Sequence, residues 1–302
     1  MNATSVRIVE VGPRDGLQNE AADIPTGEKI AFVNRLAAAG HTTIEVSAFV
    51  SPTWVPRMAD AAAVFAGIER RPGVRYTALV PNATGLARAL AAGVDEVAIF
   101  AAASETFSRR NINQTIAESL DTYRAVCADA TRAGIKVRAY LSTCFGCPFE
   151  GVVSPERVVA VAAQLLALGA YEVSLSDTIG VAHPRQVTEL LALVTKTLPL
   201  PRIALHFHDT RGTALVNVYA GLEAGVATFD ASAGGLGGCP YAPGATGNLA
   251  TEDLLYMLDG LGIDSGVRLD GVIEASRAIE PHVGHALPSR VYRAAAATGR
   301  TR

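Results

Sequence analysis

The chain has 302 residues, of which 49% are hydrophobic and only 6% aromatic, and its formal net charge is −3. This length fits one large α/β domain or two small ones. The nearly balanced charge provides no basic field for nucleic acid, and no uncharged apolar run is long enough to span a bilayer. Four cysteines in so long a chain do not make a disulfide framework, and the first residues lack a signal-peptide pattern. We therefore expect a cytoplasmic protein.

Apolar segments with the features of β-strands alternate along the chain with Ala-rich segments of helical spacing. The expected strands cover residues 6–11, 42–48, 74–80, 97–100, 137–141, 173–175, 203–207 and 228–230. The expected helices cover residues 26–39, 60–68, 84–92, 115–133, 154–168, 184–197, 213–224 and 249–258. These strand–helix units follow one another without a linker, which predicts a (β/α)8 barrel, or TIM barrel.

We expect a single catalytic domain over residues 1–302, with the barrel over about 5–260 and a C-terminal helical extension over 261–302. Asp259 and Gly260 would end the last barrel helix. A doubly wound open sheet is the alternative, and it is disfavoured because no G-x-G-x-x-G motif follows the first strand.

Polar side chains occur at the C-terminal end of almost every expected strand, which is the edge where TIM barrels carry their active sites. Solvated loops are polar too, but several of these residues stand at or within the strand ends, where solvation alone does not explain them. The edge residues are Arg14, Asp15, Glu45, Asn82, Ser142, Ser174, Asp177, His206, His208 and Ser232. This edge is therefore the expected active site.

His206 and His208 lie two residues apart on the expected strand 203–207 and its end. Side chains at this spacing point to the same face of a strand, so the two imidazoles would converge on one point. Neutral imidazole is a common ligand for divalent cations. The alternative is a pair of half-buried histidines, each satisfied by a hydrogen bond.

A glycine-rich segment, residues 234–238, precedes Cys239. It does not fit a phosphate-binding P-loop, because no Lys-Ser/Thr pair follows it. A loop of this kind could instead carry the Cys239 thiol over the barrel mouth as a proton donor or nucleophile, although many free cysteines are simply small buried side chains.

Two further features allow more than one interpretation. From the residues alone, Asn248 is better read as the N-cap of the helix at 249–258 than as an oxygen ligand. Cys144 and Cys147 form a C-x-x-C motif, but a structural zinc site requires a second pair, so we expect local packing.

Distributed motifs from residue 7 to about 267 resemble those of the hydroxymethylglutaryl-CoA lyases. The opening signature is VEVGPRDGLQNE at 9–20, and the others are FVSP at 49–52, WVP at 54–56, NIN at 111–113, GCP at 146–148, DTIGV at 177–181, AGGLGGCPY at 233–241 and GNLATED at 247–253. The resemblance implies a metal-dependent retro-Claisen cleavage of 3-hydroxy-3-methylglutaryl-CoA to acetoacetate and acetyl-CoA.

The resemblance also implies roles for individual residues. The expected ligands of Mg²⁺ or Mn²⁺ are Asp15, His206, His208 and Asn248, which overrides the N-cap interpretation of Asn248. The expected catalytic residues are Arg14 at the thioester oxygen, Asp15 or His206 as the base, Cys239 in proton transfer, and Glu45 and Asp177 in support. We assign substrate binding to Arg14, Gln18, Ser142, Ser174 and Arg211.

The chain departs from the family pattern at positions near the expected substrate, namely Ala48, Ser176, His183 and Arg211. These changes keep open a lyase for another 3-hydroxy-3-alkyl acyl-CoA, such as citramalyl-CoA. A Claisen-type synthase is disfavoured, because such enzymes lack the glycine–cysteine loop. We expect an acyl-CoA substrate, no nucleic-acid or membrane partner, and a homo-oligomer of two or more copies.

Overall fold

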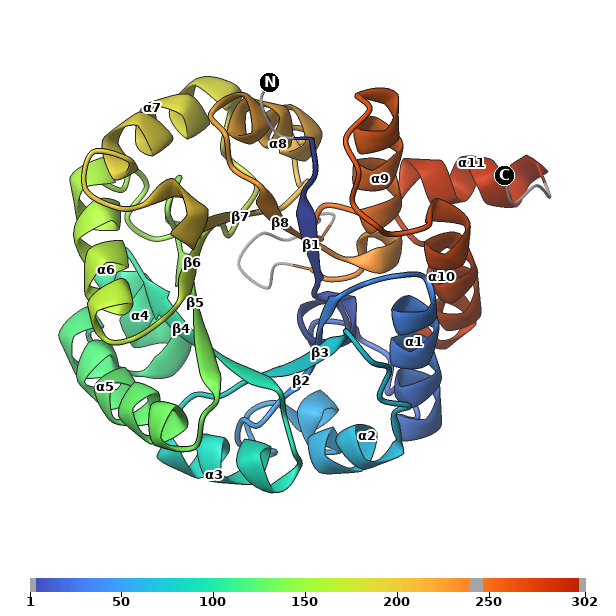
Figure 1. The fold of residues 1–302 in the computed structure, drawn as a ribbon, viewed down its shortest axis with the longest axis horizontal. Helices are drawn as coiled ribbons and strands as arrows, with labels where there is room; N and C mark the ends of the chain where they lie inside the picture. The colour runs from blue at the N-terminus through green and yellow to red at the C-terminus, as the bar shows by residue number, and fades with distance from the viewer. Residues whose placement is uncertain (1–3, 239–246, 299–302) are drawn as a thin grey trace.

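A computed structural model describes residues 4–238 and 247–298 of the chain. Its eight parallel strands form one closed barrel in chain order, with the helices arranged around the outside (Figure 1). The strands are β1 (Arg7–Glu10), β2 (Thr43–Ala48), β3 (Arg75–Leu79), β4 (Glu96–Ala102), β5 (Lys136–Ser142), β6 (Glu172–Asp177), β7 (Ile203–Phe207) and β8 (Thr228–Ala231). The predicted (β/α)8 barrel is confirmed.

The helices that follow the strands match the expected helical segments closely, because their buried residues recur at helical spacing. The helices of the described residues are α1 (Thr26–Ala38), α2 (Ala61–Gly67), α3 (Ala83–Ala91), α4 (Glu105–Ile112), α5 (Ile116–Arg132), α6 (Pro155–Ala167), α7 (Pro184–Val194), α8 (Ala214–Glu223), α9 (Thr251–Gly260), α10 (Leu269–Val283) and α11 (Arg290–Thr298). Short helical turns are η1 (Gly12–Gly16), η2 (Pro56–Met58), η3 (Leu200–Arg202) and η4 (Ala233–Gly235). The sequence did not predict α4 or the four short turns.

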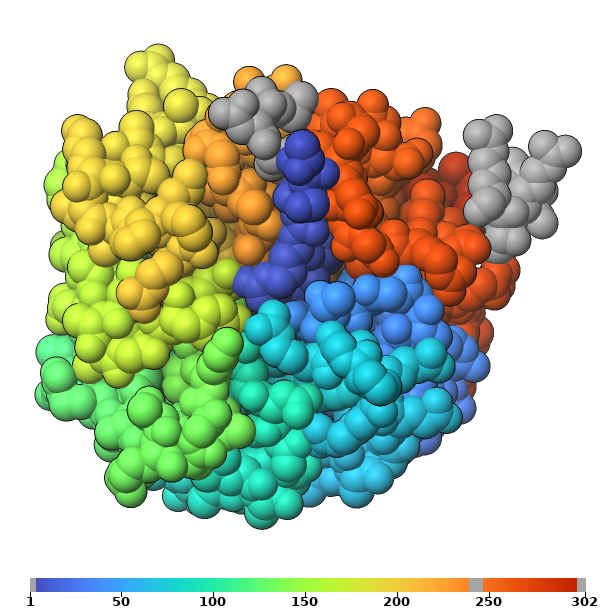
Figure 2. Space-filling model, viewed as in Figure 1, coloured from blue at the N-terminus to red at the C-terminus, as the bar shows by residue number. Residues whose placement is uncertain are grey.

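Closure of the barrel brings the first and last strands together. β1 pairs with β8 in register, from Arg7 opposite Thr228 to Glu10 opposite Ala231. Figure 2 shows the blue N-terminal part of the chain directly beside the orange and red C-terminal part. The strand ends that the sequence places at opposite ends of the chain therefore meet at one edge of the barrel.

The predicted C-terminal extension is present, and α10 packs against α1 and against the η4 turn. Leu287, in the segment between α10 and α11, is fully buried beside Gly234. The extension therefore supports the turn that follows β8. Among the described residues, no helix combines the length and the hydropathy needed to cross a bilayer.

Candidate active site at the barrel mouth

The turn η1 presents Arg14 and Asp15 immediately after β1. The backbone N–H groups of Arg14, Asp15 and Gly16 all donate to the carbonyl of Val11, which folds the chain sharply back. Gly12 lets this turn pack closely, because a Cβ atom there would lie 2.7 Å from a Glu10 carboxylate oxygen and one of them would have to shift. The G-P-R-D-G sequence thus directs two charged side chains toward the barrel mouth.

β7 and the segment before α9 place three further polar side chains beside Asp15. His206 lies on β7, and His208 follows the strand in an isolated bridge with Asn248. The bridge is flanked by a hydrogen bond of 3.0 Å from the Leu249 N–H to the Phe207 carbonyl. The N-cap interpretation of Asn248 is wrong, because α9 begins at Thr251 and its N-cap is Ala250.

Asp15, His206 and His208 form a candidate cation site. Each offers one ligand atom, and these atoms lie within 4.8 Å of one another. Asn248 donates its amide N–H to the Asp15 carboxylate over 3.0 Å, while its Oδ1 is buried and has no hydrogen-bond partner among the described residues. His208 Nδ1 is equally buried and unpartnered within the described part of the chain. Orphaned buried acceptors are costly, and a divalent cation would satisfy them.

Arg14 connects the cation site to the rest of the barrel mouth. Its Nε donates to Glu45 Oε2 over 2.5 Å and its Nη1 donates to Asp15 Oδ1 over 2.6 Å. The guanidinium also lies over the ring of Tyr140, 5.3 Å from its centroid. Two carboxylates and one aromatic face therefore fix the direction in which the positive charge points.

The electrostatic environment keeps the candidate ligands in the forms that bind cations. Burial opposes the ionisation of Asp15, but the charge of Arg14, followed by those of the two histidines, outweighs it and lowers the pKa of Asp15 to about 2. Burial, assisted by neighbouring His206, lowers the pKa of His208 to about 4. At neutral pH the site therefore offers a carboxylate and a neutral imidazole at His208.

A pocket of about 240 Å³ opens beside this cluster, and its lining residues are of two kinds, which we call the polar wall and the apolar wall. The polar wall consists of Arg14, Asp15, Gln18, Asn19, Asn111, Ser142, Ser176, Thr178, His206 and His208. The apolar wall includes Val50, Val55, Leu79, Val80, Phe100, Phe107 and Ile112. A ligand held here would have a polar, charged end near the cation site and an apolar part toward β3 and β4.

Three of the assigned substrate-binding residues, Arg14, Gln18 and Ser142, line this pocket, and Gln18 Oε1 is a buried acceptor without a partner among the described residues. The other residues lie elsewhere. Ser174 donates to Asp230 over 2.8 Å inside the barrel, and Arg211 donates to the Ile179 and Gly180 carbonyls.

Asp177 and Glu45 are both completely buried, but they act on different neighbours. Glu45 accepts from Arg14, whereas the Asp177 carboxylate accepts from the backbone N–H groups of Val181 and Ala182 and so shapes the loop after β6. Burial raises the pKa of Asp177 to about 6. Its contacts fit a supporting role better than direct contact with a ligand.

The departures from the family pattern also have distinct positions. Ser176 lines the pocket. Ala48 is fully buried at the end of β2 and is not among the residues that line the pocket. A serine hydroxyl at this position would therefore not reach a ligand in the pocket directly. His183 is the N-cap of α7 and accepts from the Gln186 N–H.

The cysteines fall into two groups. Cys144 and Cys147 are free and buried, and the Cys147 thiol lies 3.0 Å from the Ser104 hydroxyl, which agrees with local packing. Cys239, the predicted proton-transfer residue, lies outside the described residues, and its role stays a prediction.

The sequence did not indicate Asp230 or Tyr140, although both contact the site. Asp230 Oδ2 lies 3.3 Å from His206 Nδ1, and the Tyr140 ring meets the His206 ring edge-on with centroids 6.3 Å apart. Asp230 is on β8 and Tyr140 is on β5, so both are distant in sequence from His206 on β7. Only the strand register, which places Asp230 opposite His206, brings them to the site.

Comparisons with known proteins agree with this geometry. The HMGL-like family model matches residues 5–279. The 3-hydroxy-3-isohexenylglutaryl-CoA/hydroxymethylglutaryl-CoA lyase of Pseudomonas aeruginosa is 52% identical, over 96% of this chain and 96% of the relative. A solved hydroxymethylglutaryl-CoA lyase from the same species matches with a TM-score of 0.97 and 52% identity, covering 99% of this chain and 100% of that one.

A structure of an HMG-CoA lyase from Acinetobacter baumannii, in complex with coenzyme A and 3-methylmalate, matches with a TM-score of 0.93. It is 38% identical and covers 100% of this chain and 97% of that one. The resemblance inferred from the sequence motifs is confirmed, and the chain belongs to the HMGL-like family, whose members include the hydroxymethylglutaryl-CoA lyases.

Proposed function

We propose that this protein is a lyase that cleaves 3-hydroxy-3-methylglutaryl-CoA to acetoacetate and acetyl-CoA. The observation that carries the proposal is the convergence of Asp15, His206 and His208 beside Arg14 at the wall of one pocket. The relatives named as hydroxymethylglutaryl-CoA lyases support the same activity.

We further propose that Asp15, His206, His208 and Asn248 hold Mg²⁺ or Mn²⁺. Oxygen ligands together with imidazoles and open positions for water suit these ions better than tetrahedral zinc. A cation bound here supplies Lewis-acid polarisation of the substrate's C3 hydroxyl and lowers the pKa of that hydroxyl.

The side chains account for the remaining steps. Asp15 or His206 accepts the hydroxyl proton, and the C2–C3 bond then breaks as C3 becomes the ketone of acetoacetate. The bonding electrons move to the thioester as an enolate, and the guanidinium of Arg14, fixed by Glu45 and Asp15, stabilises the negative oxygen. Cys239 returns a proton to C2, which completes acetyl-CoA.

The test is a coupled assay for acetyl-CoA release with 3-hydroxy-3-methylglutaryl-CoA as substrate. We expect turnover that exhaustive chelation abolishes and that added Mg²⁺ or Mn²⁺ restores. His208→Gln should lose most of this activity, whereas Cys144→Ser, a change in a packing cysteine away from the pocket wall, should retain it. Full turnover after chelation would refute the metal-dependent mechanism.

The apolar wall of the pocket favours a second substrate, with a larger alkyl group at C3. Leu79 and Phe100 line the pocket and are only partly buried. Their exposed apolar surface could therefore pack against such a group. One relative is named for a 3-isohexenyl substrate as well as for the methyl one. Leu79→Trp should therefore reduce kcat/KM for the isohexenyl thioester much more than for the methyl thioester. Equal losses would show that the wall does not select the C3 group.

We also propose that the protein is cytoplasmic and forms a homo-oligomer. A cytoplasmic 3-hydroxy-3-methylglutaryl-CoA lyase of Rattus norvegicus, 50% identical over 96% of this chain, supports the compartment. Val216, Tyr219 and Tyr256 are large apolar side chains exposed on the adjacent helices α8 and α9, which suits a contact between copies. Sedimentation of the protein with and without Tyr256→Lys tests this surface, and a monomer in both cases would exclude it.

A further inference from the structure

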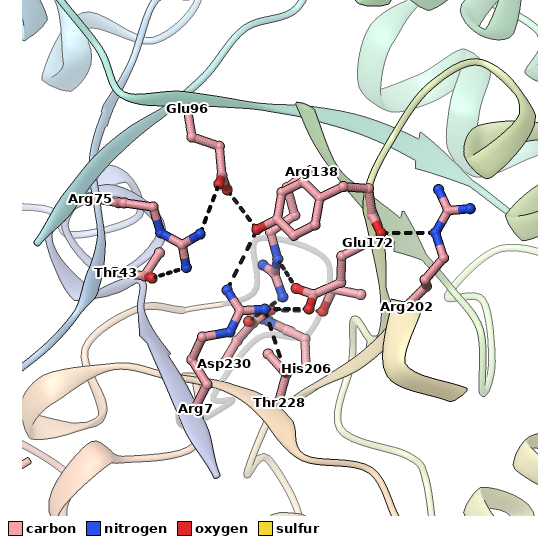
Figure 3. Close-up of polar contacts among 12 residues, drawn as sticks. Arg7, Thr43, Arg75, Glu96, Arg138, Glu172, Arg202, His206, Thr228 and Asp230 are labelled. Carbon is pink, nitrogen blue, oxygen red and sulfur yellow. Dashed lines mark hydrogen bonds and ion pairs between the residues drawn. The ribbon is translucent and has the colours of Figure 1, made fainter. Parts of the chain in front are cut away.

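A second group of charged side chains, which includes Arg138, Glu172 and Asp230, contacts His206 inside the barrel (Figure 3). At its centre is Arg138 of β5, which is 2% exposed. Its Nε donates to Glu172 over 2.7 Å and its Nη2 donates to Asp230 over 2.8 Å. The interior of this barrel is therefore not filled by branched apolar side chains alone, and the charges continue up to the active-site edge.

Asp230 connects this interior group to His206. One carboxylate oxygen accepts from Arg138, and the other accepts from Ser174 over 2.8 Å and lies 3.3 Å from His206 Nδ1. Asp230 and His206 are also register partners on β8 and β7, so the backbone ladder itself sets their approach. Residues of β5, β6 and β8 thus hold the Asp230 carboxylate beside Nδ1 of His206, which is one of the candidate ligands.

The chemistry of the contact determines where the imidazole carries its proton. Asp230 Oδ1 accepts from the Arg138 guanidinium and Oδ2 accepts from the Ser174 hydroxyl, so Asp230 is a carboxylate that only accepts hydrogen bonds. His206 Nδ1 must then carry the N–H, which leaves Nε2 with its lone pair free.

We propose that Asp230 is a positioning residue, which holds His206 in the Nδ1–H tautomer and thereby presents His206 Nε2 to the cation. Arg138 in turn fixes the carboxylate. In this arrangement His206 has no lone pair left for the substrate proton, so Asp15 is the base of the two residues named for that role. A carboxylate behind a ligating histidine orients the ring and raises its basicity, and losing such a partner typically weakens metal binding about 10–100-fold. The proposal rests on the cation site of the proposed function.

The second histidine provides an internal contrast. His208 Nδ1 has no hydrogen-bond partner among the described residues, so no carboxylate holds that nitrogen in the way that Asp230 holds His206 Nδ1. The two imidazoles, whose centroids are 5.2 Å apart, are therefore not equivalent. We expect one histidine with a fixed tautomer and one whose tautomer depends on the bound cation.

The experiment compares two isosteric variants that each remove one carboxylate charge from Arg138. Asp230→Asn removes the partner of both Arg138 and His206, whereas Glu172→Gln removes a partner of Arg138 and leaves the contact with His206 in place. We expect Mn²⁺ affinity, measured by electron paramagnetic resonance titration of the metal-free full-length protein, to fall about 10–100-fold in Asp230→Asn. In Glu172→Gln it should stay close to that of the unsubstituted protein.

Equal Mn²⁺ affinities in Asp230→Asn and the unsubstituted protein would overturn the proposal. Equal losses in both variants would also overturn it, because loosening of Arg138 would then be sufficient. Neither readout requires acyl-CoA cleavage, so failure of this proposal is distinguishable from failure of the proposed reaction.

A second measurement reads the tautomer directly. In ¹⁵N-histidine-labelled metal-free protein, the His206 signals, assigned by their loss in His206→Gln, should show a protonated Nδ1 and an unprotonated Nε2. In Asp230→Asn this preference should weaken or reverse. A protonated Nε2 at His206 in the unsubstituted protein would refute the assignment even if Asp230→Asn folds poorly.

Discussion

The contacts of Arg14 depend on the planar, forked shape of its guanidinium. It bonds Glu45 through Nε and Asp15 through Nη1, and its plane lies over Tyr140. Together these contacts leave little freedom for the positive charge that the proposed reaction requires. A lysine would carry the same charge but could not make the same fixed, forked set of hydrogen bonds.

Replacing Arg14 by Lys should therefore reduce kcat by about 10²–10³, the range that follows loss of one oxyanion-stabilising donor. Mn²⁺ affinity should change much less, because the positive charge beside Asp15 is retained. Steady-state acetyl-CoA release and Mn²⁺ titration measure the two quantities. A kcat close to that of the unsubstituted protein would remove Arg14 from stabilisation of the enolate.

At the level of the elements, hydrogen bonds to three separate parts of the chain fix the turn η4. Ala233 N–H donates to Glu10 over 2.9 Å, and Gly234 N–H donates to both carboxylate oxygens of Glu252. Ser289, at the start of α11, donates its N–H to the Gly234 carbonyl over 3.1 Å. Two buried acids and the C-terminal extension thus fix the point where the glycine segment begins.

Gly234→Ala should destabilise the protein for two separable reasons. Its φ is 69°, and an added Cβ would lie 2.6 Å from a methyl carbon of Leu287. Gly262 has the same φ of 69° but open space around it, so Gly262→Ala measures the backbone cost alone, about 1–2 kcal/mol. Urea denaturation should show a larger loss in free energy of unfolding for Gly234→Ala. Equal losses would mean that Leu287 yields without cost.

The sequence predicted those elements whose own residues carry the signal. Strands such as β7 contain apolar runs, and α5 has apolar residues at helical spacing. In contrast, α4 has the polar sequence ETFSRRNI, and only its caps marked it, with Ser104 accepting from the Phe107 N–H and Asn113 at a φ of 55°. The short turn η1 was missed because glycine and proline favour an irregular loop.

The candidate site was predictable to the same degree. Asp15 and His208 follow strands and His206 lies near the end of β7, so chain topology alone brings them to one edge. Asp230 could not be predicted, because its role depends on the register between β7 and β8 and on Arg138 from β5. Asn248 was recoverable only through family resemblance, since its local sequence favours a cap that the structure does not form.

At the level of the whole molecule, Glu10 and Glu252 make stability depend on pH. Burial raises the pKa of Glu10 to about 7 and that of Glu252 to about 8, while the unfolded chain titrates these groups near 4.5. Between these values the folded state binds more protons than the unfolded state, so the free energy of unfolding falls as pH rises. This contribution is complete below about pH 4.5 and is lost above about pH 8.

Glu252→Gln should remove the part of this dependence that belongs to Glu252. The stability of the unsubstituted protein relative to this variant should therefore decline between pH 5 and 8, as measured by urea denaturation of the metal-free protein. Glu274→Gln, a change at an exposed position of α10, should leave the profile unaltered. Parallel profiles for Glu252→Gln and the unsubstituted protein would contradict the linkage.

The pairing of β1 with β8 has a consequence for how the protein is synthesised. Residues 7–10 emerge from the ribosome early, yet their partners at 228–231 are among the last strand residues to be made. Until β8 arrives, the nascent chain has an open sheet edge that must be kept from other chains. Asp15 must likewise await His206, His208 and Asn248, so the complete set of proposed ligands first exists in a chain whose synthesis is nearly finished. On the proposed function, tight cation binding is thus a marker of the closed barrel, because a half-made chain lacks part of the proposed ligand set.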